Sequence, residues 1–389
     1  MLSSKNPVLS TDDPLFDDIR PCRDNEVVSE LAKITADPAV VDGLLRFRYP
    51  LLSRVAPFIL RPLARMKLRA AVSHITNVAQ FQDLVADFMR HMIATTTDGV
   101  TYEGFDKLDR DRGYLFISNH RDISLDPAFV DMALHENGLR TVRIAIGDNL
   151  LKMPAATSLM RLNKSFIVKR SVTSPREKLK ELTKLSQYIG LSLREGKSIW
   201  IAQREGRAKD GNDRTDATVL KMFHVYGRQL KVPFAEYLRD LNIVPVSISY
   251  EFDPGDVAKA RELYEKALHG SYHKTPLEDI RSIIDGIKGY KGHVSIVAGE
   301  PITGGFETPE ELAQLIDRFI YTHYKMYAPT LIAAGAGQNA VSEADRQRFS
   351  ARMAECPAEL KERVLSMYAY PYRNLQALKE ADAVKTESD

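Results

Sequence analysis

Residues 114–127 read YLFISNHRDISLDP, an apolar run followed by a polar turn and then a helix start. Residues 114–118 are rich in β-formers, and Asp126 stands directly before Pro127, a capping carboxylate followed by proline at the first helical position. The stretch therefore predicts a strand, a turn and a helix capped by Asp126. By themselves, His120 and Asp126 fit structural capping and hydrogen bonding as well as they fit chemistry.

The same alternation of short β-rich runs and helical patterns continues from about residue 100 onward. Further strands are expected at 142–146, 165–168, 198–203, 243–250 and 293–298. Helices are expected at 127–136, about 151–161, 175–194, 216–228, 255–268, 276–288 and 308–327. Strands alternating with helices predict an α/β fold, with a mixed, largely buried sheet flanked by helices.

The regions outside this alternation divide the chain into four expected segments. These are a loose N-terminal arm (1–25), a helical, basic, membrane-facing region (26–98), the α/β domain (99–330) and a C-terminal helical extension (331–389). The extension is expected to be helical over 341–370 with Ser342 as its cap, and its tail ADAVKTESD is expected to fray.

Composition sets limits on the class of protein. With 389 residues, 44% of them hydrophobic, the chain can bury a sizeable core, and a net charge of +2 gives no argument for nucleic acid. Two distant cysteines, Cys22 and Cys356, fit a reducing compartment better than a disulfide framework or a zinc site. There is no signal-peptide pattern and no apolar run of about 18 residues. A cytoplasmic protein is expected.

The even overall charge hides a basic segment, residues 43–82, that contains no Asp or Glu. Its cations are Arg46, Arg48, Arg54, Arg61, Arg65, Lys67 and Arg69. Apolar residues recur among them at helical intervals, and three prolines interrupt the segment. This pattern favours contact with an anionic membrane. A helical subdomain with arginines on its wet face is the alternative, and no nucleic-acid motif supports a third, nucleic-acid surface.

The triplet His120-Arg121-Asp122 matches the catalytic loop of a protein kinase, but the rest of that motif is missing. A kinase needs an Asn five residues after this Asp to hold magnesium, and Pro127 stands there instead. No DFG, glycine-rich loop or VAIK-like lysine accompanies the triplet. The kinase interpretation is excluded.

His120 and Asp126 suit a different reaction, the transfer of an acyl group from a thioester to an alcohol. A neutral histidine can take the hydroxyl proton, which contributes about 10²–10⁴-fold. An acid on its other ring nitrogen fixes the tautomer and stabilises the imidazolium. The hydroxyl attacks directly, so no Ser or Cys nucleophile is needed, and the chain has no G-x-S-x-G elbow.

Five stretches extend this interpretation in order along the chain. They are NHRDISLD (119–126), IAIGDNLL (144–151), RLNKSFIVKR (161–170), IWIAQREGRAKDG (199–211) and IVPVSISYE (243–251). Together they resemble the four sequence blocks, and a segment after the first, of the glycerolipid acyltransferase family, which includes glycerol-3-phosphate and 1-acyl-glycerol-3-phosphate acyltransferases. The first block of that family reads N-H-x-x-x-x-D, so one residue is inserted here and Asp122 becomes a rival to Asp126.

The resemblance implies a set of site residues. His120 would be the general base and Asp126 its orienting acid. Lys169 and Arg170 match the basic pair that ends the second block, and Gly206, Arg207 and Lys209 match the third. Glu205 is a further substrate-binding candidate whose role depends on the alignment, and Arg121 is a weaker one. The strand 243–250 is assigned to core packing.

The resemblance also implies a function. The expected reaction moves a fatty acyl group from acyl-CoA or acyl carrier protein to the hydroxyl of a glycerol-phosphate acceptor, with no cofactor, metal or nucleic acid. The enzyme would sit peripherally on the inner face of the cell membrane. Two alternatives stay open: an acyltransferase acting on a different lipid acceptor, and an inactive protein that binds membrane lipids.

Overall fold

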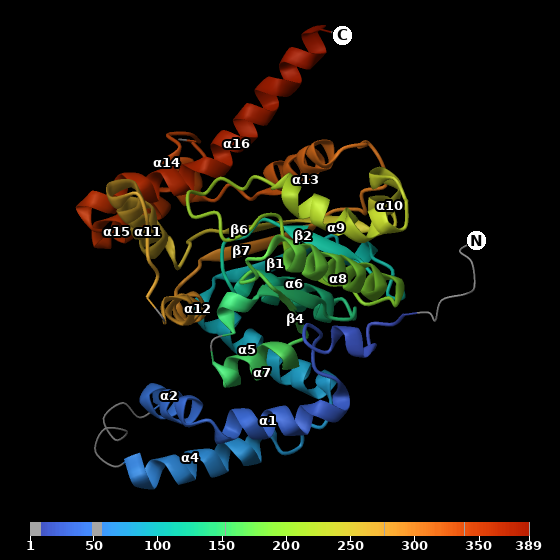
Figure 1. The fold of residues 1–389 in the computed structure, drawn as a ribbon. Coiled ribbons are helices and arrows are strands. Elements are labelled where there is room, and N and C mark those ends of the chain that lie inside the picture. Colours follow the sequence, from blue (N-terminus) through green and yellow to red (C-terminus); the bar gives the residue numbers. More distant parts are fainter. Residues whose placement is uncertain (1–8, 49–56, 152, 276, 338, 389) are drawn as a thin grey trace. The chain divides into compact units, whose positions relative to one another are not determined.

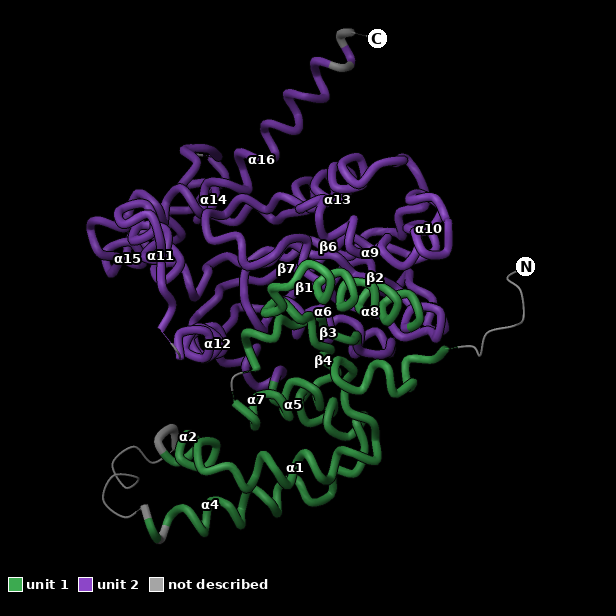
Figure 2. The backbone as a smooth tube through the Cα atoms, in the orientation of Figure 1, with its two compact units in different colours: residues 1–88, 142–191 green, residues 89–141, 192–389 purple. Residues whose placement is uncertain are grey.

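The structure is a computed structural model that describes residues 9–48, 57–151, 153–275, 277–337 and 339–388. It divides into two compact units, which Figure 2 distinguishes by colour. Unit 1 comprises residues 1–88 and 142–191, and unit 2 comprises residues 89–141 and 192–389. The expected segment boundaries after residues 98 and 330 both fall inside unit 2.

Unit 2 contains five strands in the order β1-β7-β6-β2-β5. They are β1 (Gly99–Glu103), β2 (Leu115–Ser118), β5 (Ile199–Ala202), β6 (Ile243–Tyr250) and β7 (His293–Ala298). Strand β2 pairs parallel with both β5 and β6, whereas β6 and β7 pair antiparallel. The mixed α/β class is therefore confirmed. Strand β1 was not expected, because its sequence GVTYE is half exposed and has no apolar run.

Helices cover both faces of β6, which explains why every one of its eight residues is buried. The Ser247 hydroxyl donates to the Ile320 carbonyl of α13 (Pro309–His323) at 3.1 Å. Tyr250 faces the other way, and its ring meets Phe129 of α6 (Leu125–Glu136) edge-on at 5.9 Å. Side chains three apart on a strand point to opposite faces, so α6 and α13 lie on opposite sides of β6.

The remaining helices of unit 2 mostly follow the expected pattern (Figure 1). They are α9 (Ala217–Gln229), α10 (Phe234–Arg239), α11 (Asp256–His269), α12 (Glu278–Lys288), α14 (Ala328–Ala333), α15 (Glu343–Glu355) and α16 (Lys361–Ser388). Ser342 caps α15 by accepting a hydrogen bond from the Asp345 N–H, as expected. The tail differs from the prediction: α16 continues to Ser388, and the Arg318–Asp382 ion pair holds its last turns.

Unit 1 contains the N-terminal helices and a parallel strand pair. Its elements are α1 (Val27–Ala36), α2 (Pro38–Arg48), α4 (Pro57–Val72), the first part of α5 (Val78–Thr96), β3 (Arg143–Gly147), α7 (Pro154–Leu162), β4 (Ser165–Val168) and most of α8 (Pro175–Arg194). The segment before α1, expected to be loose, is packed from residue 9: Phe16 and Ile19 are buried, and Phe16 contacts Tyr188.

Asn119 extends the pairing between β2 and β6 beyond the end of β2. Its side-chain amide donates to the Ile248 carbonyl at 2.9 Å and accepts from the Ile248 N–H at 2.8 Å. The amide therefore takes the place of a backbone partner, and it is fully buried. This contact holds the start of the following turn against the end of β6.

We predict that Asn119→Ala lowers the free energy of unfolding by about 2–4 kcal/mol, because two buried backbone groups of Ile248 lose their partners. Urea denaturation, followed by the fluorescence of Trp200, measures the loss. Asn137→Ala is the control, since Asn137 bonds only one helix carbonyl in a half-buried position. Equal losses in the two variants would contradict the assigned role.

Candidate active site

His120 lies at the carboxyl end of β2, beside the loop that follows β5. The parallel register aligns Ser118 with Ala202, so the two strands end at one level. The Gln203 N–H then donates to the Ser118 carbonyl, and the Ala208 N–H donates to the His120 carbonyl, both at 2.8 Å. The carboxyl edge of a parallel sheet is where α/β domains usually bind ligands.

His120 is hydrogen-bonded to Asp126, with 2.9 Å between Nδ1 and Oδ2. The same carboxylate oxygen accepts from the N–H groups of Arg121 at 2.6 Å and Asp122 at 2.9 Å. Because Oδ2 already accepts two backbone N–H groups, it carries no hydrogen of its own, so Nδ1 of the neutral ring is the donor in this bond. Nε2 is then the ring nitrogen that can accept a proton.

Asp122, the alternative partner for His120, instead bonds to backbone N–H groups at the start of α6. Its Oδ1 accepts from the N–H groups of Ser124 and Leu125, both at 2.9 Å, at the start of α6. The helix begins at Leu125, so the expectation that Asp126 caps it is wrong: Asp122 serves its first turn, and Asp126 reaches back to the turn. Burial, followed by the charge of Asp126, raises the pKa of Asp122.

Arg121 points into unit 2 and is buried. Its guanidinium donates to Asp213 at 2.5 Å and to the Gly211 carbonyl at 3.1 Å. Asn119 also approaches Asp213, at 3.3 Å. These contacts tie the turn after β2 to the far end of the loop after β5. Arg121 therefore stabilises the structure around the turn. Its role as a substrate ligand stays a prediction.

The loop after β5 carries the other candidates from the third block. Glu205 and Gly206 are exposed, and Gly206 has a positive φ of 74°. Arg207 is half-buried and donates to the Ser282 hydroxyl of α12 at 2.8 Å. Lys209 forms an ion pair with Glu262 of α11, and burial lowers the pKa of this lysine against the effect of that pair. Arg207 and Lys209 thus lie in the loop that bonds to His120.

Lys169 and Arg170 lie in unit 1, just beyond β4. Lys169 pairs with Asp18 and, at 3.3 Å, with Glu181. Arg170 is exposed, and its N–H donates to Asp148 at 3.2 Å. Asp148 belongs to the IAIGDNLL segment, so the second block is bonded to the segment that follows the first block in sequence.

Two aromatic residues, Tyr250 and Trp200, lie beside the His120–Asp126 pair, and the sequence pattern had not assigned a functional role to either of them. The Tyr250 hydroxyl donates to Asp126 Oδ1 at 2.8 Å. Trp200 of β5 meets the His120 ring edge-on at 5.8 Å, and its indole N–H donates to Ser118 at 3.0 Å. The signal that the sequence offered for Tyr250 was its position at the carboxyl end of the expected strand 243–250, the end at which α/β domains usually bind ligands.

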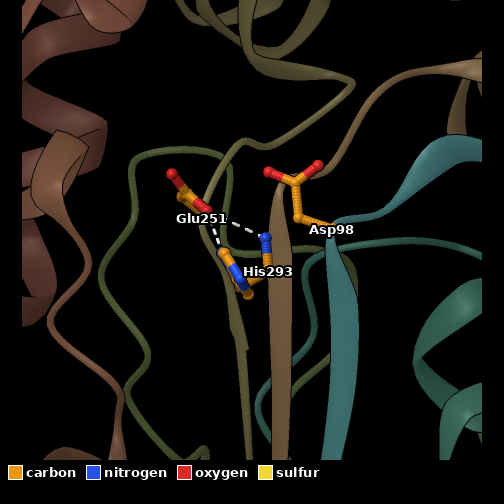
Figure 3. Close-up of side chains that lie close together, drawn as sticks. All are labelled: Asp98, Glu251 and His293. Atoms are coloured by element: carbon orange, nitrogen blue, oxygen red, sulfur yellow. Dashed lines mark hydrogen bonds and ion pairs between the residues drawn. The ribbon is translucent and has the colours of Figure 1, made fainter. Parts of the chain in front are cut away.

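One side-chain cluster in unit 2 has the composition of a metal site. Ligand atoms of Asp98, Glu251 and His293 lie within 4.8 Å of one another, and Figure 3 shows Glu251 bonded to both the ring and the backbone of His293. Arg348 already pairs with Glu251, and it approaches Asp98 at 3.6 Å. The guanidinium supplies the positive charge that a metal would bring, so the cluster fits an ion-pair network joining α15 to the sheet.

Comparisons with known proteins bear on the class of this chain. Residues 99–249 match the family model described as Acyltransferase, which is less than half of the chain. No curated protein matches the chain. A crystal structure of the 1-acyl-sn-glycerophosphate acyltransferase PlsC from Thermotoga maritima is similar at 18% identity and a TM-score of 0.35, covering 76% of this chain and 94% of that chain. A likeness this weak carries no argument about function.

The matched segment contains the His120–Asp126 pair, the loop after β5 and nearly all of β6. The protein is therefore an enzyme of the acyltransferase class. Within that class, the ordered blocks from NHRDISLD to IVPVSISYE resemble those of the glycerolipid acyltransferase family, and all but the last two residues of this series lie in the matched domain.

Proposed function

We propose that this enzyme moves a fatty acyl group from an acyl-CoA or acyl-carrier-protein thioester to the hydroxyl of a glycerol-phosphate acceptor. The acceptor would be 1-acyl-glycerol-3-phosphate or glycerol-3-phosphate. The observation that carries the proposal is the His120–Asp126 hydrogen bond, together with the bond from Ala208 that joins His120 to a basic loop.

In the proposed reaction, His120 Nε2 takes the proton of the acceptor hydroxyl as its oxygen attacks the thioester carbonyl. The tetrahedral intermediate then breaks its carbon–sulfur bond, and the imidazolium returns the proton to the departing sulfur. Asp126 holds the ring and stabilises the imidazolium between these steps. Neither cysteine is suited to act as a nucleophile: both are buried, and burial raises the pKa of the Cys22 thiol to about 11.

The acceptor phosphate would be held by the cations of the second and third blocks. Arg207 offers a planar fork that suits phosphate, and Lys209 adds a point charge. Gly206 leaves the loop accessible beside Arg207, since a side chain built there would meet nothing within 4 Å. Arg170 and Lys169 are proposed as further ligands. The Lys209–Glu262 pair would open when phosphate binds.

The basic segment would dock the enzyme on an anionic membrane. On α4, Phe58, Pro62 and Met66 alternate with Arg61, Arg65 and Arg69 along one helix face, at three- and four-residue intervals. Phe58 is 83% exposed and Met66 is 61% exposed. Such a face can insert apolar side chains between lipid headgroups while the arginines meet phosphates. Residues 49–56, including Arg54, lie outside the described residues.

None of the described helices combines the length and the apolar character needed to cross a lipid bilayer.

The first test separates the two aspartates. Asp126→Asn and His120→Ala should each lower kcat by about 10²–10⁴-fold, because the base loses its orienting acid or is itself removed. Asp122→Asn should change kcat little, since Asn also accepts hydrogen bonds at a helix start. Thiol release from acyl-CoA with a panel of acceptors measures the rates. Equal losses in both Asp variants would argue against the proposed dyad.

The second test concerns the acceptor phosphate. Arg207→Gln should raise KM for phosphate-bearing acceptors by about 10–100-fold, as expected when a charged hydrogen bond is lost. Arg214→Gln, which removes an exposed cation from the same loop, is the matched control. An unchanged KM in Arg207→Gln, or turnover of phosphate-free acceptors alone, would remove phosphate from the proposal.

The third test concerns the membrane. Replacing the exposed Lys67 and Arg69 by Gln should weaken binding to vesicles of phosphatidylcholine and phosphatidylserine by about 2 kcal/mol, at roughly 1 kcal/mol per cation. Cosedimentation gives the affinities. Replacing Arg373 and Lys379 by Gln removes the same charge from an exposed part of α16 and should have no effect. Equal binding by all forms would exclude α4 as the docking face.

A further inference from the structure

Tyr250 joins the strand that was assigned to core packing to the carboxylate beside the proposed base. It is the last residue of β6, and only 4% of its surface is exposed. Its hydroxyl lies 2.8 Å from Asp126 Oδ1, and its ring packs edge-on against Phe129 of α6. The phenol therefore reaches Asp126 from the side of the carboxylate away from His120.

The bond from Tyr250 completes the fixation of Asp126. Oδ2 receives His120 Nδ1 and two backbone N–H groups, and Oδ1 receives the Tyr250 hydroxyl. A carboxylate bonded at both oxygens cannot rotate about its Cβ–Cγ bond without losing partners. Because Oδ2 is the oxygen bonded to His120, the tyrosine helps to fix the plane of the imidazole.

We propose that Tyr250 is a positioning residue for the general-base step: it holds Asp126 and limits how strongly Asp126 retains the proton on His120. The inference rests on the proposed function, because it assumes that His120 is the base. Tyr250 touches neither substrate nor reacting atoms in this scheme, and it acts only through Asp126.

The hydrogen bond from Tyr250 should change the proton affinity of His120 in one definite direction. A hydrogen bond to Oδ1 draws negative charge away from the oxygen that faces the imidazole. Without it, more of the charge faces His120, the imidazolium is stabilised, and the ring stays protonated to higher pH. A protonated ring cannot take the acceptor proton, so the low-pH limb of the rate profile moves to higher pH.

Tyr250 acts as a hydrogen-bond donor at neutral pH. Burial, and then the charge of Asp126, raise the pKa of its phenol well above the ordinary value. The hydroxyl is therefore protonated, and it donates its proton to Asp126 Oδ1 at 2.8 Å.

Other charged groups surround this pair on several elements, and a Tyr250 variant leaves them all in place. The anions are Asp122 before α6, Asp213 in the loop after β5 and Asp253 after β6; the cations are Arg121, Lys259 of α11 and Lys291 before β7. A comparison of variants at one position therefore isolates the contribution of the phenol hydroxyl.

Trp200 provides a readout that does not depend on acyl transfer. It is the only tryptophan in the chain, it is buried, and its ring lies 5.8 Å from that of His120. A neighbouring imidazolium quenches indole fluorescence more strongly than neutral imidazole does. The pH midpoint of the Trp200 fluorescence change therefore reports protonation of His120, and His120→Ala shows which part of the change belongs to this residue.

The experiment compares Tyr250→Phe with Tyr102→Phe. The Tyr102 hydroxyl is buried and has no hydrogen-bond partner among the described residues, so its loss is the matched control. In Tyr250→Phe we expect kcat to fall about tenfold at pH 7 with KM little changed, the loss expected for a charge-assisted hydrogen bond. The fluorescence midpoint should rise by roughly half a pH unit, as should the low-pH limb of kcat/KM. Tyr102→Phe should match the wild type.

A second substitution tests the same bond in the opposite direction and keeps the hydroxyl. Genetically encoded 3-fluorotyrosine at position 250 is a more acidic donor, so the fluorescence midpoint should fall. It also serves if Tyr250→Phe fails to fold, which thermal unfolding reveals. Unchanged kcat and an unchanged midpoint in folded Tyr250→Phe, or a rise with 3-fluorotyrosine, would overturn the inference.

The proposed acyl transfer and the positioning role of Tyr250 can be tested separately. If the wild type transfers no acyl group to any glycerol-phosphate acceptor, the proposed function fails, while the fluorescence titration still tests the link between Tyr250 and His120. If transfer occurs and His120→Ala abolishes it, but the midpoint does not respond to Tyr250, only the positioning role is lost.

Discussion

The hydrogen bonds to the Asp126 carboxylate are the constraint on which the geometry of the site depends. A fully buried anion is costly unless its oxygens are bonded, and here the bonds come from three directions: the turn after β2, the His120 ring and the end of β6. Helix α6 supplies the anion itself. The orientation of His120 is thus a consequence of how α6 and β6 pack, so changes in the core of unit 2 reach the proposed base through one carboxylate.

The residue inserted in the first block is accommodated by the backbone of the turn. The consecutive N–H groups of Arg121 and Asp122 both point at Asp126 Oδ2, so the longer turn wraps around the carboxylate instead of displacing it. The Asp122 side chain turns away to the first N–H groups of α6. A side chain built on Gly286 of α12 would come within 2.3 Å of Asp122, so glycine there leaves room for the capping carboxylate.

The sequence predicted those features that depend on local pattern. Strands β2, β5 and β6 are apolar enough on both faces to be recognised, and the spacing of His120 and Asp126 follows from one strand–turn–helix unit. Features that depend on register were missed. Tyr250 meets Asp126 only because β6 runs past the end of β2, and the short, half-exposed β1 is a strand because β7 pairs with it. The Asp126–Pro127 pair was interpreted as a helix cap because the sequence alone cannot distinguish two cases. An Asp near a helix start can cap that helix, or it can lie in the first turn and bond to the preceding turn, as Asp126 does.

The kinase-like triplet has a physical meaning of its own in this fold. Its first residue is the proposed base, and its third serves the helix start. Its second, Arg121, reaches Gly211 and Asp213 at the end of the loop that carries Arg207. The Ala208 N–H bonds to the His120 carbonyl in the middle of the same loop, so the loop is held to the turn at two points. For the proposed reaction, base and phosphate ligand then keep a fixed separation. An acceptor would be selected by how far its hydroxyl stands from its phosphate, a property of the glycerol-phosphate headgroup and not of the acyl chain.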